Sequence, residues 1–321
     1  MASEKTENGV QGFPYLKPPD KTFYEKLSTA LYDKSENTIL GRTPKNWGQL
    51  LLFYTIFFSC LAALFAICMQ GLFASLDDRT PTWVLHRSLI GTNPGMGFRP
   101  ISNNTDEGSL IWYNSKNATT IGKWVNLLNE FLHEYKIDNR HNRAVCDFEH
   151  PPPADKACEV NMEDFGDCSP DNDFGYNTSF PCVYLKLNRI YGWVPEYYND
   201  TKNLPPDMPD DLVANIKAEY AKGPEYANQI WISCNGEHSV DKEHINSTRF
   251  EYYPTRGFPG YYYPYTNVNG YLSPLIAVQL RGFTPNIIIS IECRAWAKNI
   301  NYRGGYRDRE GSVHFEIMRD I

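Results

Sequence analysis

One continuous apolar stretch dominates the pattern of hydrophobic and polar residues along this chain. Residues 50–69 contain no charged residue and no proline, and the window without charge extends over residues 46–76. A bilayer core of roughly 30 Å is crossed by about 20 residues of α-helix. The stretch therefore predicts one membrane-spanning helix, and the sequence contains no second stretch of this kind.

The position of this stretch and its flanking charges predict the topology. A cleavable signal peptide would lie within about the first 15–30 residues, so an apolar run that begins near residue 50 is better read as an uncleaved signal-anchor. Arg42 and Lys45 precede the run, whereas Asp77 and Asp78 follow it. This bias places the N-terminus in the cytosol. We therefore expect a single-pass type II membrane protein with a cytosolic tail (1–48), a transmembrane helix (49–76) and an extracellular domain (77–321).

Three shorter segments have the spacing of amphipathic helices. Apolar residues spaced by three and four predict one helix near 124–136 of the extracellular domain. The residues that define its apolar face are Trp124, Leu127, Leu128, Phe131, Leu132 and Tyr135. A second helix is expected from near Pro209, and Phe23, Leu27 and Leu31 indicate a short helix before the membrane.

Most of the remaining extracellular domain alternates with a period of two. Apolar residues occupy every second position in the segments 183–188, 230–234, 287–293 and 313–318. This pattern is typical of half-buried strands in an antiparallel sheet or sandwich. Cys234 and Cys293 fall on the apolar faces of their strands, so both are expected to point into the core.

Cysteines and glycosylation sequons agree with an extracellular domain. Six of the eight cysteines follow the apolar run, and six cysteines allow 15 pairings, so spacing alone leaves the disulfides undetermined. They are Cys146, Cys158, Cys168, Cys182, Cys234 and Cys293. All five N-x-S/T sequons also follow the run and predict N-linked glycans. They begin at Asn103, Asn117, Asn177, Asn199 and Asn246.

Motifs of catalysis and metal binding are largely missing from the sequence. It has no H-E-x-x-H, no G-x-S-x-G and no Walker-type motif. The exception is Asp171-Asn172-Asp173, a D-x-D triplet of the kind that glycosyltransferases use, but it lies between Cys168 and Cys182 beside a sequon. The net charge of −7 without a large basic patch argues against nucleic-acid binding. We expect no cofactor and no metal site, and a non-enzymatic role.

Two groups of aromatic residues are candidates for protein interfaces. The apolar run begins with Phe53, Tyr54, Phe57 and Phe58, which face either another helix or lipid. Residues 252–265 (YYPTRGFPGYYYPY) combine six tyrosines with prolines and glycines. Exposed tyrosines are common anchors of interfaces, although a loop packed on its own sheet is the alternative. Because the span has no ionisable residue, any ion transport would need a partner.

Several long motifs resemble the beta subunits of the sodium/potassium-transporting ATPase and its proton/potassium relative. They are LGRTPKNW (40–47), CVYLKLNRIYGWVPE (182–196), YYYPYTNVNGYLSPLIAVQL (261–280) and ECRAWAKNINY (292–302). The resemblance extends from about residue 22 to the C-terminus, is closer to the sodium/potassium type, and is similar to the invertebrate nervana form.

The resemblance implies a role that the residues alone do not name. Members are non-catalytic subunits that bind a catalytic alpha subunit, help it fold and reach the plasma membrane, and modulate its potassium affinity. Membrane lipid and a small regulatory subunit are further expected partners. The extracellular domain would be an immunoglobulin-like sandwich with insertions, with disulfides between neighbouring cysteines. The implied alpha-subunit contacts are Phe53, Tyr54, Phe57 and Phe58 in the span, and Tyr261, Tyr262, Tyr263, Tyr265, Tyr271 and Pro274 outside it.

Two features depart from the family pattern. The loop between Cys146 and Cys158 is shorter than in many vertebrate members, and the sequons lie at different positions. A pump-independent adhesion glycoprotein is the alternative function.

Overall fold

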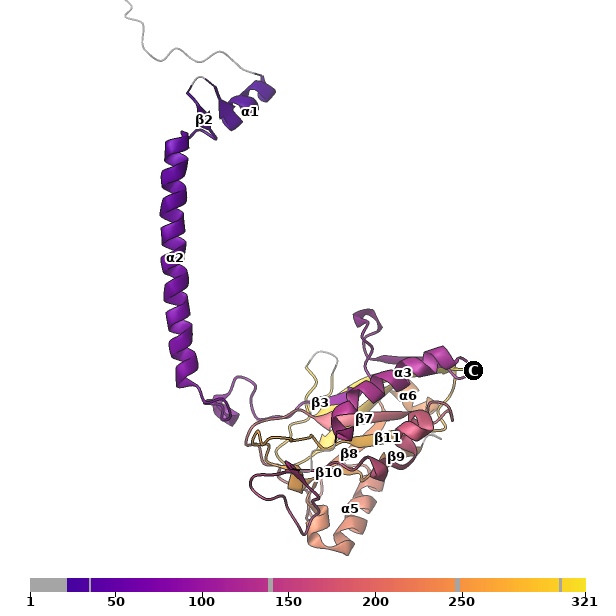
Figure 1. Ribbon diagram of the computed structural model, residues 1–321. Coiled ribbons are helices and arrows are strands. Elements are labelled where there is room, and N and C mark those ends of the chain that lie inside the picture. Colours follow the sequence, from indigo (N-terminus) through magenta and orange to yellow (C-terminus); the bar gives the residue numbers. More distant parts are fainter. Residues whose placement is uncertain (1–21, 35, 138–140, 246–248, 306–307) are drawn as a thin grey trace, which may run out of the picture. The chain divides into compact units, whose positions relative to one another are not determined.

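The structure is a computed structural model that describes residues 22–34, 36–137, 141–245, 249–305 and 308–321. The chain forms two compact units, Met1–Leu76 and Asp77–Ile321, which we call the anchor unit and the sandwich unit. Figure 1 shows a long helix in the first unit and a mainly β-stranded body in the second.

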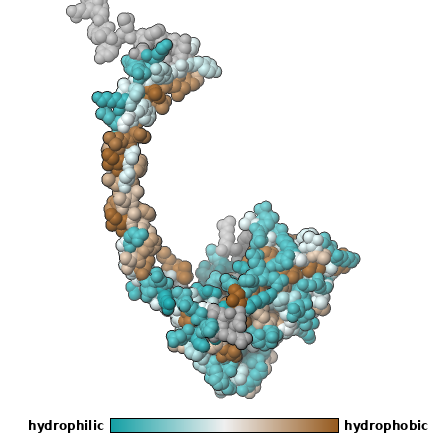
Figure 2. Space-filling view, viewed as in Figure 1, coloured by the Kyte–Doolittle hydropathy of each residue, from teal (hydrophilic) through white to brown (hydrophobic). Residues whose placement is uncertain are grey.

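A single long helix makes up most of the anchor unit. Helix α2 (Pro44–Ser75) follows helix α1 (Phe23–Leu31) and the two-residue strands β1 (Tyr32–Asp33) and β2 (Thr38–Ile39). Thr43 caps α2 by accepting a hydrogen bond from the backbone N–H of Asn46 at 3.4 Å. No residue of α2 is buried, and its most apolar window has a mean hydropathy of 2.5. Figure 2 shows this apolar surface along the helix. Length and composition thus fit the predicted single span.

Two β-sheets form the body of the sandwich unit (Figure 1). The five-stranded sheet has the order β10 (Gly257–Pro259), β8 (Gln229–Gly236), β12 (Ile289–Trp296), β13 (Ser312–Asp320), β4 (Leu110–Asn114). The four-stranded sheet has the order β3 (Met96–Arg99), β7 (Cys182–Leu187), β11 (Ile276–Arg281), β9 (Arg249–Tyr253). Strands β5 (Arg143–Ala144) and β6 (Ala157–Cys158) form a small separate pair. The two large sheets pack face to face, with the rings of Phe98 and Phe315 5.4 Å apart.

The strand predictions hold with three corrections. Strand β8 is buried on both faces, because Trp231 packs in the cluster with α5 and Ser233 is also buried. Strands β12 and β13 alternate between buried and less buried positions, as expected. Strand β7 is instead buried on both faces, because the rings of Phe165 and Phe174 cover Tyr184 on the face predicted to be exposed. The sandwich is also not wholly antiparallel, since β4 pairs with β13 in parallel.

The helix expected near 124–136 begins earlier and is interrupted. Helix α3 (Ala118–Phe131) starts where the Asn117 side chain accepts a hydrogen bond from the N–H of Thr119 at 3.0 Å. It ends at Phe131, and a separate turn, α4 (His133–Lys136), follows Leu132. The apolar spacing extends back to the buried Ile121, and the side-chain cap at Asn117 sets the start a few residues before it.

Two further helices flank strand β8 in the sequence. Helix α5 (Asp210–Lys222) confirms the helix expected after Pro209, and its buried residues Leu212 and Ile216 form a cluster with Trp231 and Trp296. The other helix is α6 (Ser239–His244). Short 3-10 turns span Leu85–Arg87, Thr105–Glu107, Met162–Cys168, Pro170–Gly175, Pro224–Ala227 and Gly260–Tyr262.

Three disulfides join neighbouring cysteines of the sandwich unit. They are Cys146–Cys158, Cys168–Cys182 and Cys234–Cys293, the pairs that the resemblance implies. The last joins directly opposed residues of β8 and β12, whose Cα atoms lie 4.0 Å apart. It therefore links adjacent strands of one sheet and does not cross between the two sheets. Cys60 and Cys68 of α2 are free and exposed.

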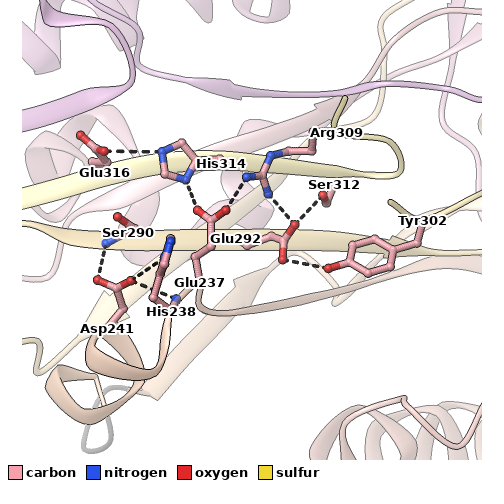
Figure 3. A network of polar contacts seen from close by, with 10 residues as sticks. All are labelled: Glu237, His238, Asp241, Ser290, Glu292, Tyr302, Arg309, Ser312, His314 and Glu316. Carbon is pink, nitrogen blue, oxygen red and sulfur yellow. Dashed lines mark hydrogen bonds and ion pairs between the residues drawn. The ribbon is translucent and has the colours of Figure 1, made fainter. Parts of the chain in front are cut away.

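A charged network occupies the outer face of the five-stranded sheet (Figure 3). Arg309 bridges two carboxylates, Glu237 and Glu292, and His314 makes a second contact with Glu237. Ser312 also donates to Glu292, at 2.7 Å. Glu237 directly follows β8, Glu292 lies in β12, and the other residues lie in β13 or just before it. The network therefore links three neighbouring strands.

Candidate interaction surfaces

Four aromatic side chains form a continuous strip on α2, which we call the span strip: Phe53, Tyr54, Phe57 and Phe58. The rings of Phe53 and Phe57 stack at 6.1 Å, and those of Tyr54 and Phe58 stack at 5.8 Å. This is the i, i+4 spacing that places side chains on one helix face. Each ring is 46–60% exposed. The strip is therefore open to lipid or to another helix.

The tyrosines of the sandwich unit gather in one region, which we call the tyrosine surface: Tyr261, Tyr262, Tyr263, Tyr265 and Tyr271. All five are half-buried. The rings of Tyr261 and Tyr262 lie 4.8 Å apart, and those of Tyr265 and Tyr271 also lie 4.8 Å apart. The structure thus brings together residues from both halves of the predicted contact segment.

Hydrogen bonds and packing hold the tyrosine surface in place. The Tyr262 hydroxyl donates to the carbonyl of Glu159 at 2.8 Å. The carbonyl of Tyr265 accepts from the N–H of Gly192 at 2.8 Å. Gly260 opens the turn where a Cβ atom would lie 2.5 Å from the Tyr197 hydroxyl, so glycine is needed there. A surface that is already ordered loses less entropy when a partner binds.

Two predicted contact residues are less accessible than the sequence suggests. The Tyr263 ring packs edge-on against Trp193 at 5.7 Å, and its hydroxyl is buried without a hydrogen-bond partner in the described chain. Pro274 is buried, as are Leu272, Ser273 and Leu275 beside it. This run enters the core just before β11. A contact between Pro274 and a partner stays a prediction, and the cavity of about 310 Å³ that Pro274 helps to line is its route to one.

Burial raises the pKa of several tyrosines of this surface further above physiological pH. It raises the pKa of Tyr271 to about 12, against a smaller opposing effect of Arg189. Burial also raises the pKa of Tyr262 and of Tyr263 well above 10. A hydroxyl with a raised pKa is neutral at physiological pH. The tyrosine surface therefore offers aromatic faces and neutral hydroxyls.

Two cavities flank Tyr261 and Tyr262. One has a volume of about 310 Å³ and is lined in part by Val160, Phe165 and Pro259. The other has a volume of about 370 Å³ and is lined in part by the prolines of 151–153 and by Tyr271. Concave apolar sites beside aromatic rings suit the side chains of a protein partner.

Distant residues support this surface in ways that sequence reasoning did not find. Phe148 packs edge-on against Tyr261 at 5.2 Å, and Arg189 lies over the rings of Tyr265 and Tyr271 at 5.6 and 5.2 Å. Arg189 falls within a motif that resembles the family, but no local pattern shows that it reaches the tyrosines. The pairing of β7 with β11 and the bridge between Tyr191 and Tyr265 bring Arg189 to the tyrosines.

The sequon asparagines of the described chain are exposed: Asn103, Asn117, Asn177 and Asn199. Two of their amide nitrogens donate hydrogen bonds, that of Asn177 to Asp173 and that of Asn199 to Asn228 at 3.0 Å. Glycosylation at Asn177 or Asn199 would alter that contact. Asn246 lies outside the described residues.

The D-x-D triplet is part of the 3-10 turn Pro170–Gly175, inside the Cys168–Cys182 loop. Within the described ranges, no group of three or more His, Cys, Asp or Glu side chains is arranged to hold a metal ion.

Comparison with known proteins gives these surfaces their context. The family model described as "Sodium / potassium ATPase beta chain" matches residues 17–315. The chain is 45% identical over 319 residues to "Sodium/potassium-transporting ATPase subunit beta-1" of Drosophila melanogaster, which covers 99% of this chain and 100% of the relative. It is 43% identical over 323 residues to subunit beta-2 of the same species, covering 98% and 99%. It is 30% identical to "Probable sodium/potassium-transporting ATPase subunit beta-3" of Caenorhabditis briggsae, covering 92% and 86%.

Proposed function

The chain belongs to the sodium/potassium ATPase beta-chain family, and from this premise we propose that it is the non-catalytic subunit that assembles with a catalytic alpha subunit. In this role it supports the folding of the alpha subunit, accompanies it to the plasma membrane and modulates its affinity for potassium. The alpha subunit performs ATP hydrolysis and ion transport.

The observation that carries this proposal is the fully uncovered helix α2. None of its 32 residues is buried by the described chain, and four of its aromatic side chains form one ordered strip. A span without ionisable groups does not conduct ions, but stacked aromatic rings on one face suit packing against another helix. We propose that the span strip packs on membrane helices of the alpha subunit.

The tyrosine surface is the second proposed contact. It is ordered by its own packing, flanked by cavities and neutral in charge. In the proposed topology, residues 1–48 are cytosolic and residues 77–321 are extracellular and carry N-linked glycans. An extracellular loop of the alpha subunit would dock on this surface.

The physical basis of chaperoning is mass action. A subunit that binds only the folded alpha subunit stabilises that state in proportion to its binding free energy. Unequal contact with two pump conformations would shift ion affinity by the difference in binding free energy.

Variants of the span strip test this proposal. We expect Tyr54→Ala with Phe57→Ala to reduce the recovery of a co-expressed alpha subunit several-fold, because burial of these rings against a partner would be lost. The measurement is alpha subunit per tagged chain after purification in mild detergent, together with ouabain-sensitive ATP hydrolysis. Leu64→Ala with Ile67→Ala, also in α2, is the matched control. Equal recovery from the Tyr54/Phe57 variant and wild type would exclude the span strip as a contact, and a wild-type chain without any alpha subunit would overturn the proposed function.

A further inference from the structure

Several arginines of the sandwich unit are paired with carboxylates. Arg256 contacts Asp211 at 2.7 Å, Arg281 contacts Glu251 at 2.6 Å, and Arg294 contacts Asp207 at 2.6 Å. Arg99, Lys186 and Arg189 form no ion pair with a carboxylate of the described chain and lie over aromatic rings instead. We call these three residues the cationic patch. Such a patch is notable on a chain whose net charge is −7.

Strand pairing places the first two cations side by side. Gly97 of β3 is opposite Lys186 of β7, so Arg99 is the diagonal neighbour of Lys186 on the same sheet face. Both charges also lie beside one aromatic ring. The guanidinium of Arg99 and the ammonium of Lys186 are each 5.5 Å from the centroid of Phe131, at the end of α3.

Arg189 connects the patch to the tyrosine surface. It follows β7 directly, and its Nε donates to the hydroxyl of Ser273 at 3.0 Å. Its guanidinium lies over the rings of Tyr265 and Tyr271. The cationic patch and the tyrosine surface are therefore one continuous area that shares Arg189.

The charges of the patch are only partly compensated within the described chain. Burial lowers the pKa of Lys186, and Arg99 and Arg189 lower it further, while Glu134 of α4 opposes these effects. Glu134 is exposed and makes no ion pair with the patch. Like charges held this close repel one another, so an anion that enters the patch gains attraction from all three.

We propose that Arg99, Lys186 and Arg189 receive carboxylate side chains of the protein that docks on the tyrosine surface. This inference rests on the proposed function, because it names the chemistry of the partner's docking segment. The partner there carries aspartate or glutamate beside the residues that contact the tyrosines. The continuity of the two areas favours a protein carboxylate over a free anion, because one docking segment covers both. Charge complementarity of this kind fixes the register of an interface.

A zero-length cross-linker tests the contact directly. A carbodiimide joins a lysine amine to a carboxylate as an amide only when the two groups touch, and the lowered pKa of Lys186 favours its reaction near neutral pH. The complex of the full tagged chain with its alpha subunit is treated in mild detergent and digested, and linked peptides are identified by mass spectrometry. We expect an amide between Lys186 and an aspartate or glutamate of the alpha subunit. Lys186→Arg should abolish this link, because a guanidinium does not form the amide with an activated carboxylate.

Each other outcome is informative. An intact complex in which Lys186 stays unlinked, or links only to Glu134, to a lipid headgroup or to a glycan, overturns the inference and leaves the proposed function standing. Failure to recover any alpha subunit with the wild-type chain overturns the proposed function as well.

Charge removal gives an independent measurement. We expect Lys186→Gln with Arg189→Gln to lower alpha-subunit recovery by roughly 3- to 10-fold at physiological salt, and the difference from wild type to shrink as salt is raised. Lys217→Gln on α5 removes an exposed lysine elsewhere and should change nothing. Equal recovery from the double variant and wild type at every salt concentration contradicts the inference.

Discussion

Gly175 occupies a backbone conformation that other residues adopt only with strain. Its φ is +76°, and a Cβ atom added there would lie 2.0 Å from the carbonyl oxygen of Phe180. The residue is buried inside the Cys168–Cys182 loop, where neighbouring side chains cover β7. A tightly closed loop thus depends on one residue without a side chain.

Substitution of Gly175 should be far more harmful than substitution of another glycine with positive φ. We expect Gly175→Ala to lower the free energy of unfolding by about 3 kcal/mol or more, since strain and a backbone clash add. Gly192→Ala is the matched control: φ is +71°, and nothing lies within 4 Å of the added Cβ. That variant should lose only about 1 kcal/mol. Denaturation of the two purified chains compares them, and similar losses would contradict the steric argument.

A charged residue of the network in Figure 3 should make stability depend on pH. Burial by itself raises the pKa of Glu237, but Arg309 and His314 outweigh it, so the pKa lies below its ordinary value. A carboxyl group with a lowered folded-state pKa stabilises the fold fully above its unfolded pKa of about 4.3. This contribution is lost as the pH falls below that value and through the folded-state pKa.

Glu237→Gln should therefore lower stability at pH 7 by about 1–3 kcal/mol, because Arg309 and His314 lose a charged partner. The difference in stability between the variant and the wild type should become smaller below about pH 4. Thermal unfolding measured across pH 3–8 checks this, with the exposed Glu149→Gln as control. A stability difference that does not change with pH would show that the charge of Glu237 is not what stabilises the wild type.

At the scale of elements, helix α5 is held by a small core of its own. Leu212 and Ile216 are fully buried and form a cluster with Met208, Trp231 and Trp296 that is separate from the main core. Strand β8 thus contributes side chains to two cores. Helix α5 covers the outer face of the five-stranded sheet at this strand.

Truncation within this cluster should cost stability in proportion to burial. We expect Ile216→Ala to lower the free energy of unfolding by about 2–4 kcal/mol, as for other buried isoleucines. Val213→Ala on the same helix removes a half-buried side chain and should cost about 1 kcal/mol or less. Denaturant unfolding measures both, and an equal effect at the two positions would contradict the packing of α5 described here.

At the scale of the whole molecule, the two units allow assembly and adhesion to be separated. Exchange of residues 49–76 for an unrelated apolar helix leaves the sandwich unit and its surfaces unchanged. If the chain acts as a pump subunit through the span strip, this exchange should reduce surface pump density several-fold. Adhesion through the sandwich unit tolerates any anchor. Quantitative surface labelling and a cell-aggregation assay on the same cells measure both, and unchanged pump density in the exchanged chain would favour adhesion.

The sequence by itself determined the features that depend on local order. A run of apolar residues defines α2 because a helix satisfies its own backbone hydrogen bonds in any surroundings. Periodicity likewise located α5 and the alternating strands β12 and β13, and motif resemblance identified the family. These inferences need only the identity and spacing of neighbouring residues.

The tertiary structure alone decided what distant segments do to one another. It placed β4 parallel to β13 and buried both Pro274 and the two faces of β7. It also brought Arg99, Lys186 and Arg189 together beside the tyrosines. The physical reason is that burial and charge compensation depend on which segments lie opposite each other, and no local spacing specifies that arrangement.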